Sequence, residues 1–238
     1  MIYELAGLRV LIKNQYEYTN RFCKDYLSED QDSPVDLTAV VTQEEFDEEK
    51  AQSLNFSDGY IENICLYRSI CLQMPLFGRI LMHSSILEYE GKAYAFLGRS
   101  GTGKSTHTKL WLKNIPNTKV VNGDKPILAY TQDKFIAFGT PWQGKEGWGT
   151  KTRAPLCGLC FLEQAKENSI IRLTNKEVTS RLFTQLLIPH TEDGAVATLE
   201  LADKLIEKTP AYLLRCDISE GAVQKSFEAL TGKNYAEK

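Results

Sequence analysis

Apolar residues along this chain come mostly in short runs separated by polar turns, and a smaller number of stretches have helical spacing. Short apolar runs between turn residues predict β-strands, and apolar residues three and four positions apart predict amphipathic helices. Strands are expected over residues 2–12, 36–41, 79–88, 93–97, 118–121, 126–131, 135–138, 154–163 and 211–216. Helices are expected over residues 58–73, 104–113, 175–188, 198–208 and 219–230, and the acidic stretch 43–50 is either a solvated helix or a loop.

Several of these strands follow one another too closely for a regular alternation of strand and helix. Turns at residues 89–92 and 132–134 join neighbouring strands and predict hairpins. Hairpins inside the core predict a mixed β-sheet instead of a purely parallel one. We therefore expect an α/β fold, with a mixed sheet flanked by helices over residues 58–238 and a small α+β extension over residues 1–57.

The stretch from Gly98 to Ser105 matches the P-loop pattern G-x-x-x-x-G-K-[ST], and it lies between a predicted strand and a predicted helix. Glycines let the backbone bend around phosphate groups, while successive N–H groups and the helix N-terminus point at the anion. Lys104 adds a positive charge for the β- and γ-phosphates, and the Ser105 hydroxyl can ligate Mg²⁺. The residues expected to bind the nucleotide are Gly98, Ser100, Gly101, Thr102, Gly103, Lys104, Ser105 and Thr106.

The composition of the chain indicates which classes of partner and which cellular compartment to expect. The chain has 28 basic and 31 acidic residues, so its net charge of −3 gives no support for nucleic-acid binding. No apolar stretch approaches the length of a membrane span, and no export signal is apparent. The six cysteines are scattered and are expected to be reduced, buried thiols. A cytoplasmic location is expected, and self-association is left open.

Three further side chains are candidates for chemistry at the phosphates. Asp124 follows a strand and is expected to ligate Mg²⁺ together with Ser105, although the preceding Asn-Gly pair is also typical of a tight turn. His83, on the strand before the P-loop strand, either assists proton transfer or is a hydrogen-bonded structural residue. Arg153 either pairs with phosphate oxygens through its planar guanidinium or is a surface arginine before a strand.

The order of these motifs resembles the superfamily of HPr kinase/phosphorylase and phosphoenolpyruvate carboxykinase. It runs as Leu81-Met82-His83-Ser84-Ser85, the P-loop, Asn122-Gly123-Asp124-Lys125-Pro126, Gly139-Thr140-Pro141-Trp142 and Lys151-Thr152-Arg153-Ala154-Pro155. The resemblance covers residues 60–238, and it is closest to compact, HPr-kinase-like bacterial proteins often found near peptide-maturation genes. It implies a P-loop core in a mixed sheet, with ATP and Mg²⁺ as cofactors.

The resemblance also implies roles for single residues. His83 would lie near the transferred phosphate, Asp124 at the metal and Arg153 at the γ-phosphate. The family carries two consecutive aspartates, the first serving as general base, whereas this sequence has Gly123 at that position. His83 is the nearest replacement base in the motif order, and Gly123→Asp is expected to raise activity or leave it unchanged.

The expected function is therefore ATP-dependent transfer of the γ-phosphate to a hydroxyl, with His83, Lys104, Asp124 and Arg153 as catalytic residues. The acceptor is either a serine on a protein or peptide or a small metabolite, and the sequence does not choose between them. The alternative is a non-catalytic ATP-binding switch or assembly partner in a peptide-maturation system. The glycine-rich segment 139–149 is expected to act as a lid, whose Trp142 and Trp148 either stack on adenine or substrate or anchor the loop.

Overall fold

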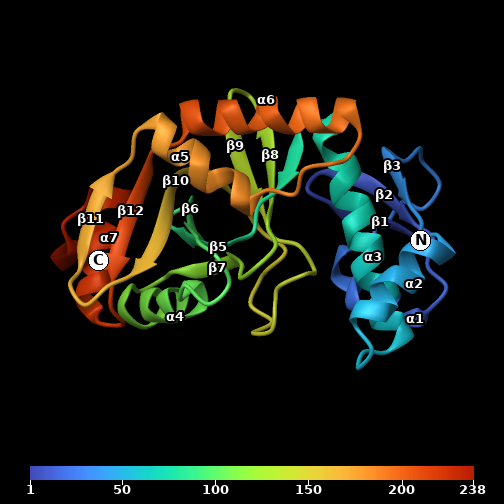
Figure 1. Ribbon diagram of the computed structural model, residues 1–238, viewed down its shortest axis with the longest axis horizontal. Helices are drawn as coiled ribbons and strands as arrows, with labels where there is room; N and C mark the ends of the chain where they lie inside the picture. Colours follow the sequence, from blue (N-terminus) through green and yellow to red (C-terminus); the bar gives the residue numbers. More distant parts are fainter.

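A computed structural model describes all residues, 1–238, and shows a mixed α/β protein built on two sheets (Figure 1). A three-stranded sheet at the N-terminus has the order β1-β2-β3, and a nine-stranded mixed sheet forms the main body. The strands of the first sheet are β1 (Ile2–Leu5), β2 (Leu8–Ile12) and β3 (Leu37–Ala39). Those of the second are β4 (Arg79–Leu81), β5 (Ser84–Tyr89), β6 (Lys92–Leu97), β7 (Lys119–Asn122), β8 (Ile127–Thr131), β9 (Lys134–Phe138), β10 (Arg153–Gln164), β11 (Ser169–Arg172) and β12 (Ala211–Cys216).

The long strand β10 holds the main sheet together. Its first residues pair antiparallel with β9, and its later residues lie parallel between β6 and β12. The remaining order is β4-β8-β9 on one side and β6-β5-β7 on the other, with β11 antiparallel to β12 at the far edge. The expectation of a mixed sheet flanked by helices is confirmed, and its hairpins β5–β6 and β8–β9 lie where the sequence predicted them.

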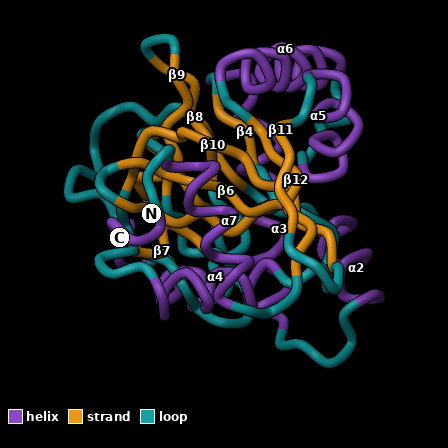
Figure 2. The backbone as a smooth tube through the Cα atoms, turned by 90° about the vertical axis from the view of Figure 1, so that its left-hand side faces the viewer, coloured by secondary structure: helices purple, strands orange, loops and turns teal.

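Helices cover both faces of the main sheet (Figure 2). One face packs against α5 (Asn175–Leu182) and α6 (Glu192–Lys208), which bury residues such as Leu182 and Leu205. The other face packs against α4 (Lys104–Asn114) and α7 (Glu220–Thr231), where Trp111 and Phe227 are fully buried. None of the helices is both long enough and apolar enough to cross a membrane.

The three remaining helices belong with the N-terminal sheet. They are α1 (Glu17–Phe22), α2 (Gln43–Gln52) and α3 (Asp58–Gln73). Leu66, Tyr67 and Ile70 of α3 are buried in one cluster with Tyr3 and Val10 of the sheet. Residues 1–77, here called the N-terminal layer, therefore pack together, whereas the sequence placed the start of the main domain at residue 58. The apolar spacing of 58–73 specifies an amphipathic helix but not the surface that its apolar face contacts.

Some expected elements are divided or extended in the structure. Residues 2–12 form a hairpin instead of one strand, because Ala6 and Gly7 turn the chain with φ values of 50° and 75°. The stretch 79–88 is interrupted at His83, between β4 and β5. The helix expected at 198–208 begins at Glu192, and the one expected at 175–188 ends at Leu182, followed by a single 3₁₀ turn. Strand β11 and helix α1 had no matching prediction.

Candidate functional site

The glycine-rich loop 98–103 joins β6 to α4, so the predicted succession of strand, loop and helix is confirmed. Gly98, Gly101 and Gly103 have φ values of 154°, 82° and 106°, which L side chains rarely adopt. The backbone N–H groups of Gly101, Gly103, Lys104 and Ser105 donate to no acceptor within the protein. Free N–H groups clustered at the start of a helix favour the binding of an anion.

Lys104 lies over this loop. Its ammonium group donates to the carbonyl oxygen of Gly98 at 2.7 Å, and only 8% of the residue is exposed. Burial lowers the pKa of Lys104, while the negative charge of Asp124 acts to raise it. The lysine is thus a partly desolvated cation held against the loop by backbone carbonyl oxygens. Gln164, at the end of β10, supports the same loop through a hydrogen bond from its amide to the carbonyl of Gly101.

The strand register brings two other candidates to the same end of the sheet. Ser84 at the start of β5 pairs with Leu97 at the end of β6, so His83 lies beside the beginning of the glycine-rich loop. The Ser84 N–H donates to the carbonyl of Asp124 at 3.2 Å. Asp124 follows β7, whose pairing with β5 carries it to this edge. His83, Lys104 and Asp124 are therefore neighbours although they come from three different segments.

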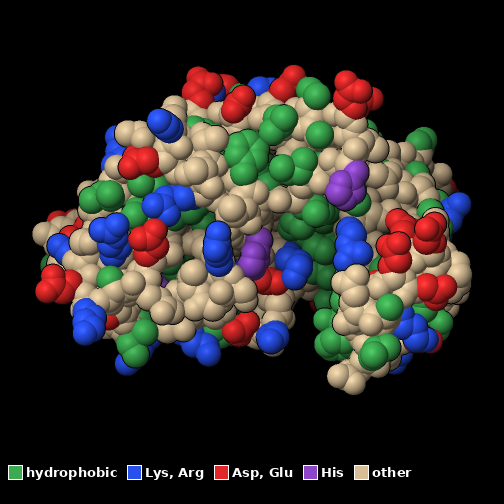
Figure 3. All heavy atoms as spheres, in the orientation of Figure 1, with side chains coloured by type: hydrophobic (Ala, Val, Ile, Leu, Met, Phe, Trp, Pro, Cys, Tyr) green, Lys and Arg blue, Asp and Glu red, His purple; other side chains and the backbone are tan.

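The Asp124 carboxylate is shared by two partners, His83 and Lys125. Nε2 of His83 lies 3.2 Å from Oδ1, and Nζ of Lys125 lies 2.7 Å from Oδ2. Burial acts to raise the pKa of Asp124, but the hydrogen bonds from His83 and Lys125 outweigh it and hold that pKa well below its usual value. The carboxylate is ionised throughout the neutral range. In the space-filling view, a histidine lies among basic side chains near the middle of one face (Figure 3).

Asn122, which the sequence suggested only as part of a tight turn, is the structural centre of this cluster. It is fully buried, and its side-chain oxygen accepts from the N–H groups of Asp124 and Lys125 at 2.9 and 2.7 Å. Its side-chain nitrogen donates to the Thr140 hydroxyl at 2.9 Å and to the Trp142 carbonyl at 3.2 Å. One amide thus fixes both the Asp124 turn and the segment that follows β9. The Asn-Gly pair predicted a turn, but the sequence alone does not reveal that the Asn122 side chain is buried and hydrogen-bonded.

The segment expected to be a lid is fixed along most of its length. Trp142 is buried and stacks on Tyr67 of α3, with ring centroids 3.9 Å apart. Farther along, the Trp148 carbonyl accepts from the N–H of Gly123 at 2.8 Å. The exposed part is the tip, Gly144–Gly147. Of the two roles open to Trp142, the structure therefore supports loop anchoring.

A magnesium site fits the residues present. Ser105 lies half-buried in the first turn of α4, and its hydroxyl makes no hydrogen bond within the protein. Each carboxylate oxygen of Asp124 has a second lone pair beyond the one that accepts from His83 or Lys125. No group of three acidic, histidine or cysteine side chains lies together. Mg²⁺ bound with a nucleotide needs no such cage, because phosphate oxygens and waters complete its octahedron.

The structure does not bring Arg153 to this site. It is the first residue of β10, eight positions before Phe161, which pairs with Leu97 next to the glycine-rich loop. An extended strand of that length covers roughly 26 Å. Arg153 instead lines a separate cavity, and no residue of the loop 98–103 lines that cavity.

His107 and the six cysteines take no part in the candidate site. His107 is buried, and its Nε2 lies 3.0 Å from the Ser226 hydroxyl. All six cysteines are free, and Cys157 and Cys160 lie on the core strand β10. Burial raises the pKa of Cys157 and of Cys160, so neither thiol is activated.

A comparison of the chain with models of known protein families finds none that matches, and a comparison with curated proteins finds no similar sequence.

Proposed function

We propose that this protein is an ATP- and Mg²⁺-dependent phosphotransferase that resembles HPr kinases and transfers the γ-phosphate to a hydroxyl group. The observation that carries the proposal is the meeting of two features at one end of the sheet. The glycine-rich loop offers free N–H groups and a buried lysine for phosphates. The His83–Asp124 pair lies beside it and provides a base and a carboxylate.

The loop and Lys104 account for phosphate binding. The free N–H groups of residues 101 and 103–105 would hold the phosphate oxygens, and the Lys104 ammonium would exchange its bond to the Gly98 carbonyl for one to the β- and γ-phosphates. Desolvated cations aimed at the position where charge develops are worth more than cations in water. Lys125, paired with Asp124, is a second cation at the same edge.

Ser105 and Asp124 are the residues that would hold Mg²⁺. Bound there, the ion neutralises charge on the β- and γ-phosphates and orients them. The ionised state of Asp124 supports this role, because a carboxylate with a low pKa stays available as a ligand at every pH of interest.

His83 is the proposed base. The Asp124 carboxylate accepts from one of its ring nitrogens, which orients the imidazole. Its other ring nitrogen can then take the proton of an acceptor hydroxyl as phosphoryl transfer proceeds. The side chain is 40% exposed, so an acceptor can reach it from solvent. This pair would replace the carboxylate that the family carries at the position of Gly123.

One observation favours the alternative of a non-catalytic nucleotide-binding protein. A Cβ atom at position 123 would lie 3.2 Å from the carbonyl oxygens of Gln143 and Trp148, so the loop closes over the place where the family has its general base. A switch or assembly partner would need the nucleotide site but not that base. Turnover separates the two functions, because only the kinase consumes ATP in the presence of an acceptor.

The test is ATP binding and transfer in wild type, Lys104→Ala and Lys113→Ala. Calorimetry with Mg·ATP should show binding to wild type and to Lys113→Ala, whose lysine lies exposed at the far end of the same helix. Lys104→Ala should lose transfer by roughly 3–4 kcal/mol of transition-state stabilisation, a few hundredfold in rate. Equal ATP affinity in Lys104→Ala and Lys113→Ala would contradict the site. Transfer is followed with radiolabelled ATP against serine peptides and hydroxylated metabolites. Tight binding with no transfer to any of them would favour the non-catalytic alternative.

A further inference from the structure

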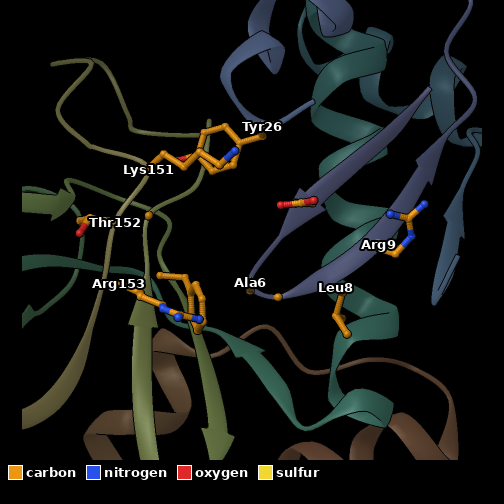
Figure 4. Close-up of a pocket in the computed structure, with 11 residues that line it drawn as sticks. Ala6, Leu8, Arg9, Tyr26, Lys151, Thr152 and Arg153 are labelled. Carbon is orange, nitrogen blue, oxygen red and sulfur yellow. The ribbon is translucent and has the colours of Figure 1, made fainter. Parts of the chain in front are cut away.

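A cavity of about 410 Å³ lies between the N-terminal layer and the main sheet (Figure 4). One wall is the β1–β2 turn with Ala6 and Leu8, and the other is formed by the end of β9 and the start of β10. Tyr26 and Phe138 add aromatic surface. The volume and the place between two packed units suit a small-molecule site.

Two cations face this cavity without an acidic partner. Lys151 lies in a bend just before β10 and Arg153 is the first residue of that strand, and both line the cavity. Nζ of Lys151 lies 5.6 Å from the centre of the Tyr26 ring, and neither Lys151 nor Arg153 forms a salt bridge or a side-chain hydrogen bond. In Figure 4 both project from the same side, opposite Ala6 and Leu8.

The other charged residues of the cavity are already engaged. Arg9 points away from Lys151 and Arg153 in Figure 4. Its guanidinium donates to the carbonyls of Pro34, Asp30 and Ser33 and lies 3.5 Å from the Asp30 carboxylate. The single carboxylate of the lining, Glu4, accepts from the Ser28 hydroxyl at 3.2 Å. With one carboxylate against the three basic side chains of Arg9, Lys151 and Arg153, the lining keeps a net positive charge.

We propose that this cavity binds a small organic anion, with a carboxylate or phosphate group between Lys151 and Arg153 and an apolar or aromatic body against Tyr26, Phe138 and Leu8. Arginine pairs with planar oxyanions through two parallel hydrogen bonds, and lysine adds a point charge. The site is distinct from the glycine-rich loop, so it is separate from the nucleotide site proposed above.

The experiment titrates the full chain, without nucleotide, with phenyl phosphate, with phthalate and with uncharged benzyl alcohol. Binding is measured by calorimetry and by changes in NMR chemical shifts. Wild type should bind phenyl phosphate or phthalate, and the preference between them tells which oxyanion the site takes. Arg153→Gln and Lys151→Gln should each weaken that binding about tenfold, as expected for a charge-assisted hydrogen bond. Lys145→Gln removes a positive charge from the exposed tip of the same segment and should bind as wild type does.

Three results would overturn the proposal. The first is that neither anion binds to wild type, and the second is that benzyl alcohol binds as well as they do. The third is that Lys104→Ala, and not Arg153→Gln or Lys151→Gln, removes the binding, which would assign the anion to the glycine-rich loop. Thermal unfolding of each variant shows that it is folded, and the two separate substitutions keep the test valid if one of them misfolds. Failure to bind ATP would leave this result unaffected.

Discussion

Asp124 combines three demands in one carboxylate: it orients His83, neutralises Lys125 and is the proposed metal ligand. The hydrogen bonds from His83 and Lys125 keep the group ionised despite its partial burial. A metal ion would bind the remaining lone pairs of the ionised carboxylate and would not have to displace a proton from it. Loss of the charge should therefore affect the metal more than the fold, because the side chain is not fully buried.

Asp124→Asn tests this division at the scale of one residue. The amide keeps the size of the side chain but removes its charge and leaves Lys125 unpaired. We expect the Mg²⁺ concentration for half-maximal activity to rise at least tenfold, while the thermal midpoint changes by a few degrees. A metal titration of activity measures the first and circular dichroism the second. Wild-type metal dependence in the variant would reduce Asp124 to a turn residue.

His107 predicts a pH dependence of stability that is independent of function. Burial lowers the pKa of His107 from 6.5 to about 4. As the pH falls below 6.5, the unfolded chain binds a proton on this imidazole that the folded protein binds only near pH 4. The stabilisation is therefore complete above pH 6.5 and is lost as the pH falls from 6.5 through 4. By pH 5 the free energy of unfolding should have fallen by roughly 2 kcal/mol.

Urea unfolding at pH 7 and pH 5 measures this loss. His107→Gln cannot take up the proton, so its stability should change less than that of wild type between the two pH values, whatever its stability at pH 7. An identical change in the variant would mean that other groups cause the acid sensitivity.

The sequence predicted His83, Lys104 and Asp124 but could not predict what holds them. Lys104 belongs to a motif whose spacing alone fixes its surroundings, and the register of β5 on β6 then brings His83 beside it. Asn122 acts through buried hydrogen bonds to residues eighteen and twenty positions away. Arg153 was assigned on motif order, which does not reveal that β10 carries it away from the glycine-rich loop.

At the scale of elements, the segment between β9 and β10 passes close to the Asp124 turn at one of its glycines. A Cβ atom at Gly144 would lie 2.8 Å from Cβ of Asp124, whereas one at Gly147 would meet nothing within 4 Å. Both glycines have positive φ values, 76° and 63°. The two positions thus share a left-handed backbone conformation and differ in what the added methyl group touches.

Gly144→Ala and Gly147→Ala form a matched pair for this reason. Each should lose about 1 kcal/mol of stability, because alanine disfavours the left-handed region. Only Gly144→Ala should also displace Asp124, and we expect its transfer rate or metal affinity to fall at least tenfold more than that of Gly147→Ala. Activity assays at saturating and limiting Mg²⁺ measure the difference. Equal losses in the two variants would show that the contact with Asp124 has no functional role.

The structure also changes the expectation for Gly123→Asp. The sequence suggested a gain or no change, on the analogy of two consecutive aspartates. The carbonyl oxygens of Gln143 and Trp148 lie where they would meet the new Cβ atom at 3.2 Å, and they repel a carboxylate as well. The aspartate would have to displace the segment that Asn122 holds, so a loss is now the expected result.

At the scale of the whole molecule, the N-terminal layer contacts residues that hold the candidate site in place. The Tyr67 hydroxyl on α3 donates to the carbonyl of Lys125 at 2.8 Å, and the Tyr67 ring stacks on Trp142. The carbonyl of Trp142 in turn accepts from Asn122. Apolar spacing predicted the helix over residues 58–73 correctly, but only the tertiary structure shows that it reaches the Asp124 turn.

The two tryptophans of the segment should respond differently to truncation. Trp142→Ala opens a cavity between α3 and the main sheet and should cost about 3–5 kcal/mol. Trp148 is half-exposed, so Trp148→Ala should cost about 1 kcal/mol or less. Urea unfolding followed by far-ultraviolet circular dichroism measures both without relying on tryptophan fluorescence. A similar cost for the two would contradict the anchoring role of Trp142.

The burial of Trp142 and Ile127 beneath the N-terminal layer bears on how this chain can be divided and recombined. Residues 79–238 contain the entire main sheet, yet expressed alone they would present both side chains to water and leave the Lys125 carbonyl without its tyrosine. Exposed apolar surface of this kind promotes aggregation. Exchanging the first 77 residues for those of another protein would require the recipient to supply the same aromatic contact. The N-terminal part is accordingly not an interchangeable module, and any redesign has to treat it together with the site.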